Sequence, residues 1–295
     1  MKVREIQKNV HNIYLKGNKA SVALLSDLHW DNPKCDRKLL KAHLDYCKKE
    51  TIPIVIVGDM FCLMQGRGDN RKSKSDILPE HNNSHYLDSV VDTAVEWFAP
   101  YAHLIAVIGY GNHETAIIKW QETDVLKRFV QMMNLKHHTD IKLGGYGGWI
   151  VYTLDMRPNS NAKKSKTAAF KHKYFHGSGG GGVVTKGALN LTRALEMYEG
   201  MDIFSMGHIH ENASRNDVRE DLEYSAGRLG YQLKHKQIHH CITGTYKEEY
   251  EDGSKGWHVE RGAPPKPLGG RILELTVKEK KPNTIKKVDS RLFPI

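Results

Sequence analysis

Five short motifs in the chain consist largely of residues that can bind metal ions or transfer protons. They read SDLH at 26–29, GD at 58–59, GNHE at 111–114, HG at 176–177 and GHIH at 207–210. Their donor groups are carboxylates, an amide and imidazoles, without a thiolate, which suits manganese, iron, zinc or nickel rather than copper or an iron–sulfur cluster. A single Asp or His after a strand is more often a cap or a turn residue. Five such motifs together predict a metal centre.

Each motif follows a stretch that we expect to be a β-strand. Apolar runs occupy residues 21–25, 54–57, 104–108 and 203–206, and a strand-like stretch at 173–175 precedes the HG motif. The four apolar runs are too short for helices and almost wholly apolar, which is typical of strands buried on both faces of a sheet. Because ligands gather beyond the carboxyl ends of strands in open α/β sheets, we expect the motifs to meet there.

Helices are predicted between these strands. Apolar residues at helical spacing mark residues 36–50, 86–98, 115–133 and 188–198, and Asp36 is a suitable N-cap for the first helix. Strands that alternate with helices in this way predict an α/β protein.

The last third of the chain is β-like at residues 238–243 and 271–277, with Gly- and Pro-rich segments between. We expect these strands to complete the same unit. The whole chain, 1–295, is therefore predicted to be one domain, with a motif-bearing core at 21–210 and a C-terminal β-rich completion at 211–295.

Composition excludes several classes of protein. The 295 residues include no apolar run of the roughly 20 residues that a membrane span requires. The charged start of the chain precedes no apolar segment, so a secretory signal is not expected. The four cysteines form no CxxC pair, which favours reduced thiols in a cytoplasmic protein, in the host cell if a phage encodes it.

The net charge of +10 favours a polyanionic partner such as DNA or RNA, although an excess of lysine also serves solubility. Polar segments at 65–85 and 159–173 are expected to be exposed loops, either solvated insertions or a positive rim around a phosphate-bearing substrate. The glycine-rich segment 178–182 is expected to be a flexible loop, with a phosphate cradle as the alternative. Four aromatic residues could stack on bases or pack in the core, namely Trp120, Tyr146, Trp149 and Tyr174.

In this order the motifs resemble those of the calcineurin-like metallophosphoesterase superfamily, over residues 21–210. The segment 244–270 is similar to the ending of phosphoesterase-like proteins encoded in phage genomes. The superfamily resemblance implies a four-layer α/β/β/α sandwich of two mixed β-sheets flanked by helices, with the site at one edge of both sheets.

The resemblance also implies a role for each motif residue. Two divalent metal ions are implied, manganese first, with iron, zinc, nickel or magnesium as alternatives. One ion would be held by Asp27, His29 and His210, the other by Asn112, His176 and His208, and Asp59 would bridge the two. His113 would be the catalytic histidine and not a ligand.

Two departures from the superfamily bear on the branch. Its protein phosphatases continue the GD motif as VDRG, whereas this chain continues as MFCL at 60–63. The aspartate that would orient His113 in those enzymes therefore has no counterpart. The nuclease branch usually has GNHD where this chain has GNHE, and Glu114 is not among the implied ligands.

The physical chemistry of such a site favours phosphoester hydrolysis. Two cations about 3.5–4 Å apart can bind phosphate oxygens and lower the pKa of bound water to about 7. A general acid such as His113 contributes about 10²–10⁴-fold. We expect a phosphodiesterase or nuclease that acts on nucleic acid or nucleotides. The alternatives are a phosphomonoesterase or protein phosphatase on the same site, and a non-catalytic binding or assembly protein with a vestigial site.

Overall fold

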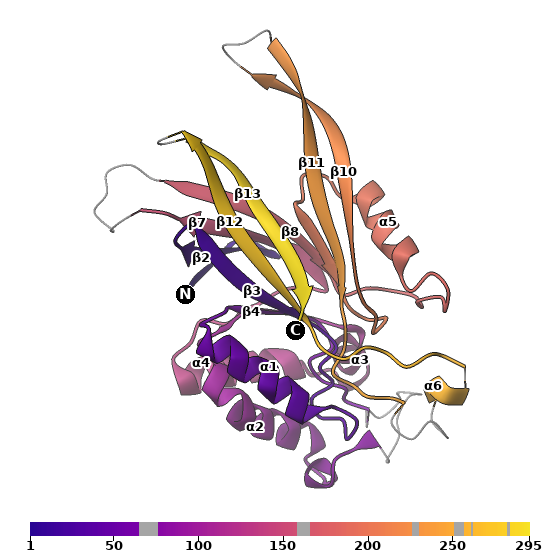
Figure 1. Ribbon diagram of the computed structural model, residues 1–295. Helices are drawn as coiled ribbons and strands as arrows, with labels where there is room; N and C mark the ends of the chain where they lie inside the picture. Colours follow the sequence, from indigo (N-terminus) through magenta and orange to yellow (C-terminus); the bar gives the residue numbers. More distant parts are fainter. Residues whose placement is uncertain (65–75, 158–165, 226–229, 251–256, 261, 282–283) are drawn as a thin grey trace.

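The computed structural model describes residues 1–64, 76–157, 166–225, 230–250, 257–260, 262–281 and 284–295. Two β-sheets, of six and seven strands, face each other, and helices lie against their outer faces (Figure 1). Both sheets contain parallel and antiparallel pairs. The α/β sandwich of two mixed sheets that the sequence predicts is confirmed.

The six-stranded sheet contains the first three predicted strands. Its order is β13 (Thr284–Pro294), β12 (Arg271–Lys281), β3 (Lys19–Leu25), β4 (Ile54–Val57), β5 (Ile105–Gly109) and β6 (Lys142–Leu143). The strands β3 to β6 run parallel, and β12 joins β3 antiparallel. Three motif-bearing strand ends therefore point in the same direction.

The seven-stranded sheet contains the other two motif-bearing strands. Its order is β1 (Lys2–Gln7), β2 (Val10–Lys16), β7 (Gly147–Asp155), β8 (Thr167–Phe175), β9 (Ile203–Met206), β11 (Gly230–Thr243) and β10 (Asn212–Ser225). The strands β8 and β9 run parallel as neighbours, so the HG and GHIH motifs leave the sheet side by side.

Helices form the outer layers. They are α1 (Arg37–Lys49), α2 (Tyr86–Phe98), α3 (Asn112–Gln121), α4 (Val125–His137), α5 (Ala188–Met197) and the short α6 (Trp257–Glu260). The first four share a core with the six-stranded sheet, and α5 packs on the seven-stranded sheet. Asp36 caps α1 as predicted, because its Oδ1 accepts a hydrogen bond from the Leu39 N–H at 2.8 Å.

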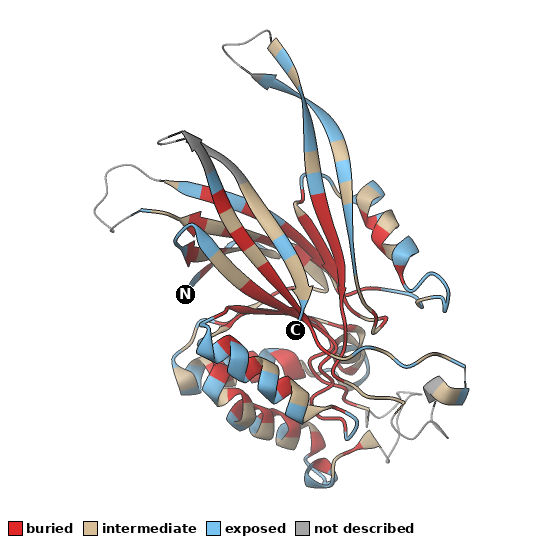
Figure 2. Ribbon diagram, in the orientation of Figure 1, coloured by how far each residue is buried: buried red, intermediate tan, exposed pale blue. Residues whose placement is uncertain are grey.

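The apolar strands are buried on both faces, as their composition predicts. In β3, Ala23 and Leu25 pack with the helices, whereas Val22 and Leu24 pack into the core between the two sheets. Burial of this kind holds the strand ends in place (Figure 2). Among the described residues, no helix is long and apolar enough to cross a membrane.

The prediction of one helix over 115–133 is wrong. Two helices, α3 and α4, occupy this region, and the chain turns between them at Glu122, which has a left-handed backbone with φ of 52°. Asp124 then caps α4, since its Oδ1 accepts the Lys127 N–H at 2.9 Å. The break between α3 and α4 was not predicted because the helical spacing of apolar residues continues across it.

Two predicted loops are only partly described. Residues 65–75 and 158–165 lie outside the described residues, and 79–81 form a short 3₁₀ turn. The prediction of an exposed loop over 159–173 is wrong at its end, because β8 begins at Thr167. Lys173 there is only 8% exposed, and its Nζ lies 4.5 Å from the centre of the Tyr198 ring. The strands β11 and β12 are also longer than the β-like stretches predicted at 238–243 and 271–277.

A buried polar chain runs across the inner face of the seven-stranded sheet, over β7, β8 and β9. His172 on β8 exchanges hydrogen bonds with the Tyr152 hydroxyl at 2.8 Å and with Ser205 Oγ at 2.6 Å. All three side chains are fully buried. Burial lowers the pKa of His172 from 6.5 to about 3. The folded protein therefore keeps this imidazole neutral at pH values where the unfolded chain protonates it.

We expect the free energy of unfolding to fall as the pH is lowered from 6.5 toward 3, because only the unfolded chain gains this proton. His172 contributes about 2 kcal/mol to the difference between pH 7.5 and pH 5. Urea unfolding at both values should show a smaller difference for His172→Gln than for the wild type. The exposed-site control His103→Gln should keep the wild-type difference, and an unchanged difference in His172→Gln would contradict the assignment.

Candidate metal centre

The five motifs meet at one edge of the sandwich. Asp27 and His29 follow β3, Asp59 follows β4, and the GNHE motif follows β5 and opens α3. From the other sheet, the HG motif follows β8 and the GHIH motif follows β9. The carboxyl ends of strands from both sheets thus place the predicted side chains close together, as expected from the position of each motif directly after a strand.

The backbone at the motifs is strained. The residues Asp27, His29, Asp59, His208 and His210 all have left-handed backbones, with φ of 49°, 45°, 47°, 69° and 56°. Residues other than glycine rarely adopt this conformation, and such outliers cluster at functional sites. Five of the seven predicted ligands therefore sit where the fold holds the chain against its local preference.

Glycine precedes several ligands because another ligand lies against its α-carbon. A side chain at Gly111 would collide with the carboxylate of Asp59, and one at Gly207 would collide with that of Asp27. Close packing between the loops therefore requires the glycine that precedes Asn112 and the one that precedes His208.

One half of the centre gathers around Asn112. Its Oδ1 lies 2.8 Å from His208 Nδ1 and 3.1 Å from His176 Nε2. The Oδ2 of Asp59 lies 3.2 Å from the same His176 nitrogen. The four side chains predicted as one metal set and its bridge are therefore close neighbours, and donor atoms of Asp59, His176 and His208 can converge on one ion.

The other half contains Asp27, His29 and His210. The Nε2 of His210 lies 3.3 Å from His29 Nε2 and 3.5 Å from Asp27 Oδ1. Asp27 Oδ2 accepts hydrogen bonds from Ser26 Oγ at 2.5 Å and from the His208 N–H at 2.9 Å. Its buried Oδ1 accepts no hydrogen bond from the described residues. A cation would satisfy this oxygen.

Charge in the centre is balanced by imidazoles. Burial alone would raise the pKa of Asp59, but the imidazoles of His176 and His113 hold it well below its ordinary value. Burial opposes a charge on His176, yet the Asp59 carboxylate raises the pKa of His176 to about 10. Burial and then repulsion from His113 hold the pKa of His29 well below its ordinary value. A neutral imidazole such as His29 is the form that binds metal.

His113 lies against the predicted ligands Asp59 and His29, and its donor atoms lie within reach of one ion together with those of His29 and Cys62. It lies in the first turn of α3, and its Nδ1 donates a hydrogen bond to the Cys62 carbonyl at 2.5 Å. Its Nε2 lies 3.9 Å from Asp59 Oδ2, and its ring meets that of His29 edge to face at 4.8 Å. The backbone carbonyl of Cys62 thus orients His113 in place of the aspartate that the phosphatase pattern would supply.

Sequence reasoning gave Glu114 no role, yet it joins two of the motif loops. Its buried carboxylate accepts hydrogen bonds from the N–H groups of Gly111 at 2.8 Å, Phe61 at 2.9 Å and Asp59 at 3.2 Å. Burial and the neighbouring Asp59 raise the pKa of Glu114 to about 8, against the effect of these donors. Glu114 stands three residues after Gly111, the spacing of a capping box, and this spacing could have indicated its hydrogen bond to the Gly111 N–H.

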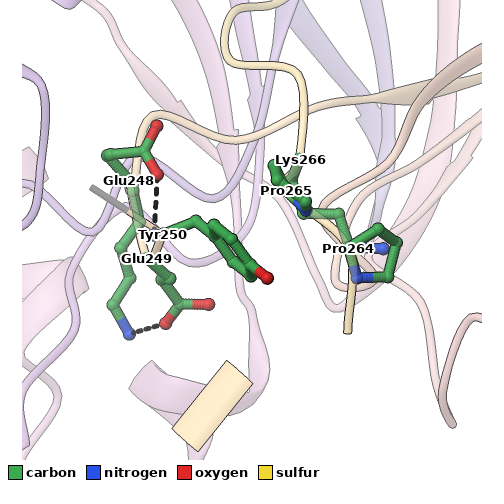
Figure 3. Close-up of a pocket in the computed structure, with 7 residues that line it drawn as sticks. Glu248, Glu249, Tyr250, Pro264, Pro265 and Lys266 are labelled. Carbon is green, nitrogen blue, oxygen red and sulfur yellow. Dashed lines mark hydrogen bonds and ion pairs between the residues drawn. The ribbon is translucent and has the colours of Figure 1, made fainter. Parts of the chain in front are cut away.

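The C-terminal third also contributes contacts that no motif indicated. The Asp27 carbonyl accepts hydrogen bonds from Tyr246 N–H at 3.0 Å and Thr245 Oγ1 at 2.9 Å. Glu249 Oε2 lies 3.8 Å from His210 Nδ1, and its Oε1 lies 2.6 Å from Lys247 Nζ. Figure 3 shows residues 247–250, which line a small pocket together with Pro264, Pro265 and Lys266.

The candidate aromatic residues lie in different surroundings. Tyr174 is buried in the core between the sheets, and Trp149 packs with the core under α5. Trp120 is exposed on α3. Tyr146 lies at the centre, where its hydroxyl donates to the Gly177 carbonyl at 2.8 Å and its ring meets that of His176 edge to face.

Comparisons with known proteins add little. No family model matches the chain, and no curated protein matches it. Among solved structures, the chain is similar to GAP50, titled the anchor in the inner membrane complex of Plasmodium. That likeness has 13% identity and a TM-score of 0.41, over 92% of this chain and 89% of the other. A likeness at this score carries no argument.

We expect the wild-type chain to bind two Mn²⁺ ions and His208→Ala to bind at most one, because the substitution removes a donor 2.8 Å from Asn112 Oδ1. Elemental analysis after gel filtration and isothermal titration calorimetry would measure this. His103→Gln, at an exposed position, should bind as the wild type does. Equal uptake by His208→Ala and the wild type would remove His208 from the ligand set.

Proposed function

We propose that the chain is a two-metal phosphoester hydrolase of the calcineurin-like metallophosphoesterase superfamily, and that it acts as a phosphodiesterase or nuclease on nucleic acid or nucleotides. The observation that carries the proposal is the meeting of eight side chains from five strand ends at one edge of both sheets. The donor set fits divalent metal ions, manganese first, because it joins two buried carboxylates, an amide oxygen and four imidazoles.

The unsatisfied Asp27 Oδ1 is the clearest sign that the centre needs a cation. A buried carboxylate oxygen that accepts no hydrogen bond costs free energy, and a divalent ion would offset that cost. The bound ions would supply Lewis acidity, by lowering the pKa of bound water and by neutralising charge on the phosphate. Asp27, His29 and His210 would hold one ion, and Asn112, His176 and His208 the other.

Asp59 and His113 would have different roles, one as a metal ligand and the other as a proton donor. The Asp59 carboxylate, which lies against His176, would bridge the two ions. His113 would present Nε2 to the substrate, because its Nδ1 is engaged by the Cys62 carbonyl. From Nε2 it would donate a proton to the leaving oxygen, and the nearby Asp59 would stabilise its charged form.

The surroundings of the centre favour a polyanionic substrate over a small one. The chain carries a net charge of +10. The N-terminus of α3 adds positive potential there, whereas the charge of Lys247 beside the centre is paired with that of Glu249. We also propose a cytoplasmic location, which the four free, buried cysteines support.

We expect Mn²⁺-dependent hydrolysis of bis-p-nitrophenyl phosphate by the wild type. Asp59→Asn should abolish it, because the bridging charge is lost. His113→Ala should keep both metal ions but lose about 10²–10⁴-fold in kcat, most for poor leaving groups. Steady-state rates and metal content would be measured on the same samples. Full activity in Asp59→Asn would remove the two-metal mechanism, and metal loss in His113→Ala would make His113 a ligand.

We expect binding of a single-stranded oligonucleotide to weaken steeply with salt. A slope of log K against log[salt] of about −2 or steeper would indicate three or more phosphate contacts. Fluorescence anisotropy with the inactive Asp59→Asn variant would measure binding without cleavage. A flat response, together with faster turnover of monoesters than diesters, would instead support the phosphomonoesterase alternative.

A further inference from the structure

The hairpin of β10 and β11 extends far beyond the body of the protein (Figure 1). The strand β11 pairs with β9 only over His239–Ile242, so further out its described strand neighbour is β10 alone. We call residues 216–225 and 230–237 the hairpin arm. A two-stranded ribbon of this kind is marginally stable in water unless something packs against it.

One face of the hairpin arm carries five exposed apolar side chains, four of them in its outer part beyond the ion pair of Glu220 with His235. Register places Leu222 opposite Leu233 and Tyr224 opposite Tyr231, and Val218 lies on the same face because side chains alternate along a strand. These five side chains are between 58% and 66% exposed. The distal hairpin is mostly pale blue, the colour of exposed residues, in Figure 2. This face is opposite to the one that α5 covers, since Ile238 and Ile242 face α5.

Charge on the hairpin argues against a nucleic-acid occupant. The described residues of β10 and β11 carry four Lys and Arg side chains and four Asp and Glu side chains, so the hairpin is neutral in a chain of net charge +10. A polyanion would bind elsewhere on such a protein. Two copies of the basic chain, by contrast, could approach through a neutral apolar surface without strong repulsion.

The edge of β10 is complementary to itself in one register. The strand β10 is the last strand of its sheet. If it pairs antiparallel with β10 of a second copy about a two-fold axis at Val218, Arg219 lies opposite Asp217 and Asp221 lies opposite Arg215. An axis at Asp217 would instead place Asp217 opposite itself and Arg215 opposite Arg219. An axis at Arg219 would place Arg219 opposite itself and Asp217 opposite Asp221. Opposite charges on facing strands stabilise a pair, and like charges destabilise it.

We propose that the hairpin arm is a dimerisation surface, on which β10 pairs antiparallel with β10 of a second copy about Val218 and the apolar face packs in the dimer. Pairing about a two-fold axis would join the two seven-stranded sheets edge to edge. It would pair the outer edge of β10 and bring Leu222 of each copy beside Ser214 of the other, and the alternating charges would disfavour other edge partners.

Cross-linking of Val218→Cys tests the register. Opposed residues of an antiparallel pair have α-carbons about 4.5–5.5 Å apart, within the range that a disulfide spans. Val218 is 65% exposed and the four native cysteines are buried, so only the new thiol is accessible to mild oxidation. Mild oxidation of Val218→Cys should yield a covalent dimer. Leu222→Cys is a matched control of similar exposure, and it should yield none because it would lie opposite Ser214 of the second copy.

Analytical ultracentrifugation over a dilution series tests the surface. The wild type should be a dimer, and Leu222→Glu with Leu233→Glu should weaken dimerisation by about 100-fold or more. Circular dichroism and metal content would show that this variant is folded. A monomeric wild type, a dimer unaffected by the two substitutions, or a Val218→Cys dimer without a disulfide would each overturn the proposal. So would oligonucleotide binding that these substitutions weaken.

Discussion

Two carboxylates are buried at the edge where both sheets end, and their negative charge constrains everything around them. Asp27 and Asp59 are almost fully shielded from water, and each lies against a glycine of another motif loop. Burying unpaired charge is costly, so such a pair persists only where other groups or ions balance it. The imidazoles gathered there, and the raised pKa of His176, are that balance. The proposed metal ions would take over the same role.

The fold meets this constraint with parallel strands from two sheets rather than one. Three ends come from the six-stranded sheet and two from the seven-stranded sheet. Left-handed backbone conformations at five of the ligands turn the loops sharply at these ends. Glu114 then connects the loops after β4 and β5 through three backbone N–H groups. The strain at the ligands is held by hydrogen bonds and packing outside them.

Much of the fold and the site was predictable from the sequence because the signals were local. The strands at 54–57 and 203–206 have the predicted bounds, because each is a short, almost wholly apolar run that ends at a glycine. The motifs at those strand ends also indicated which side chains would meet at one edge of the sheets. The roles of Cys62 and Glu249 could not be predicted, because a backbone carbonyl and a side chain distant in sequence leave no pattern. The break at Glu122 was missed because the apolar repeat continues across it.

The hydrogen bonds that Tyr246 and Thr245 donate to the Asp27 carbonyl have a consequence for synthesis of the protein. They join residues separated by more than two hundred positions, and Ser26 is likewise held by Thr243. A nascent chain still lacking this segment would contain every predicted ligand and none of these hydrogen bonds. The candidate centre would therefore gain its braces only late in translation, after the ribosome has delivered the segment beyond β11.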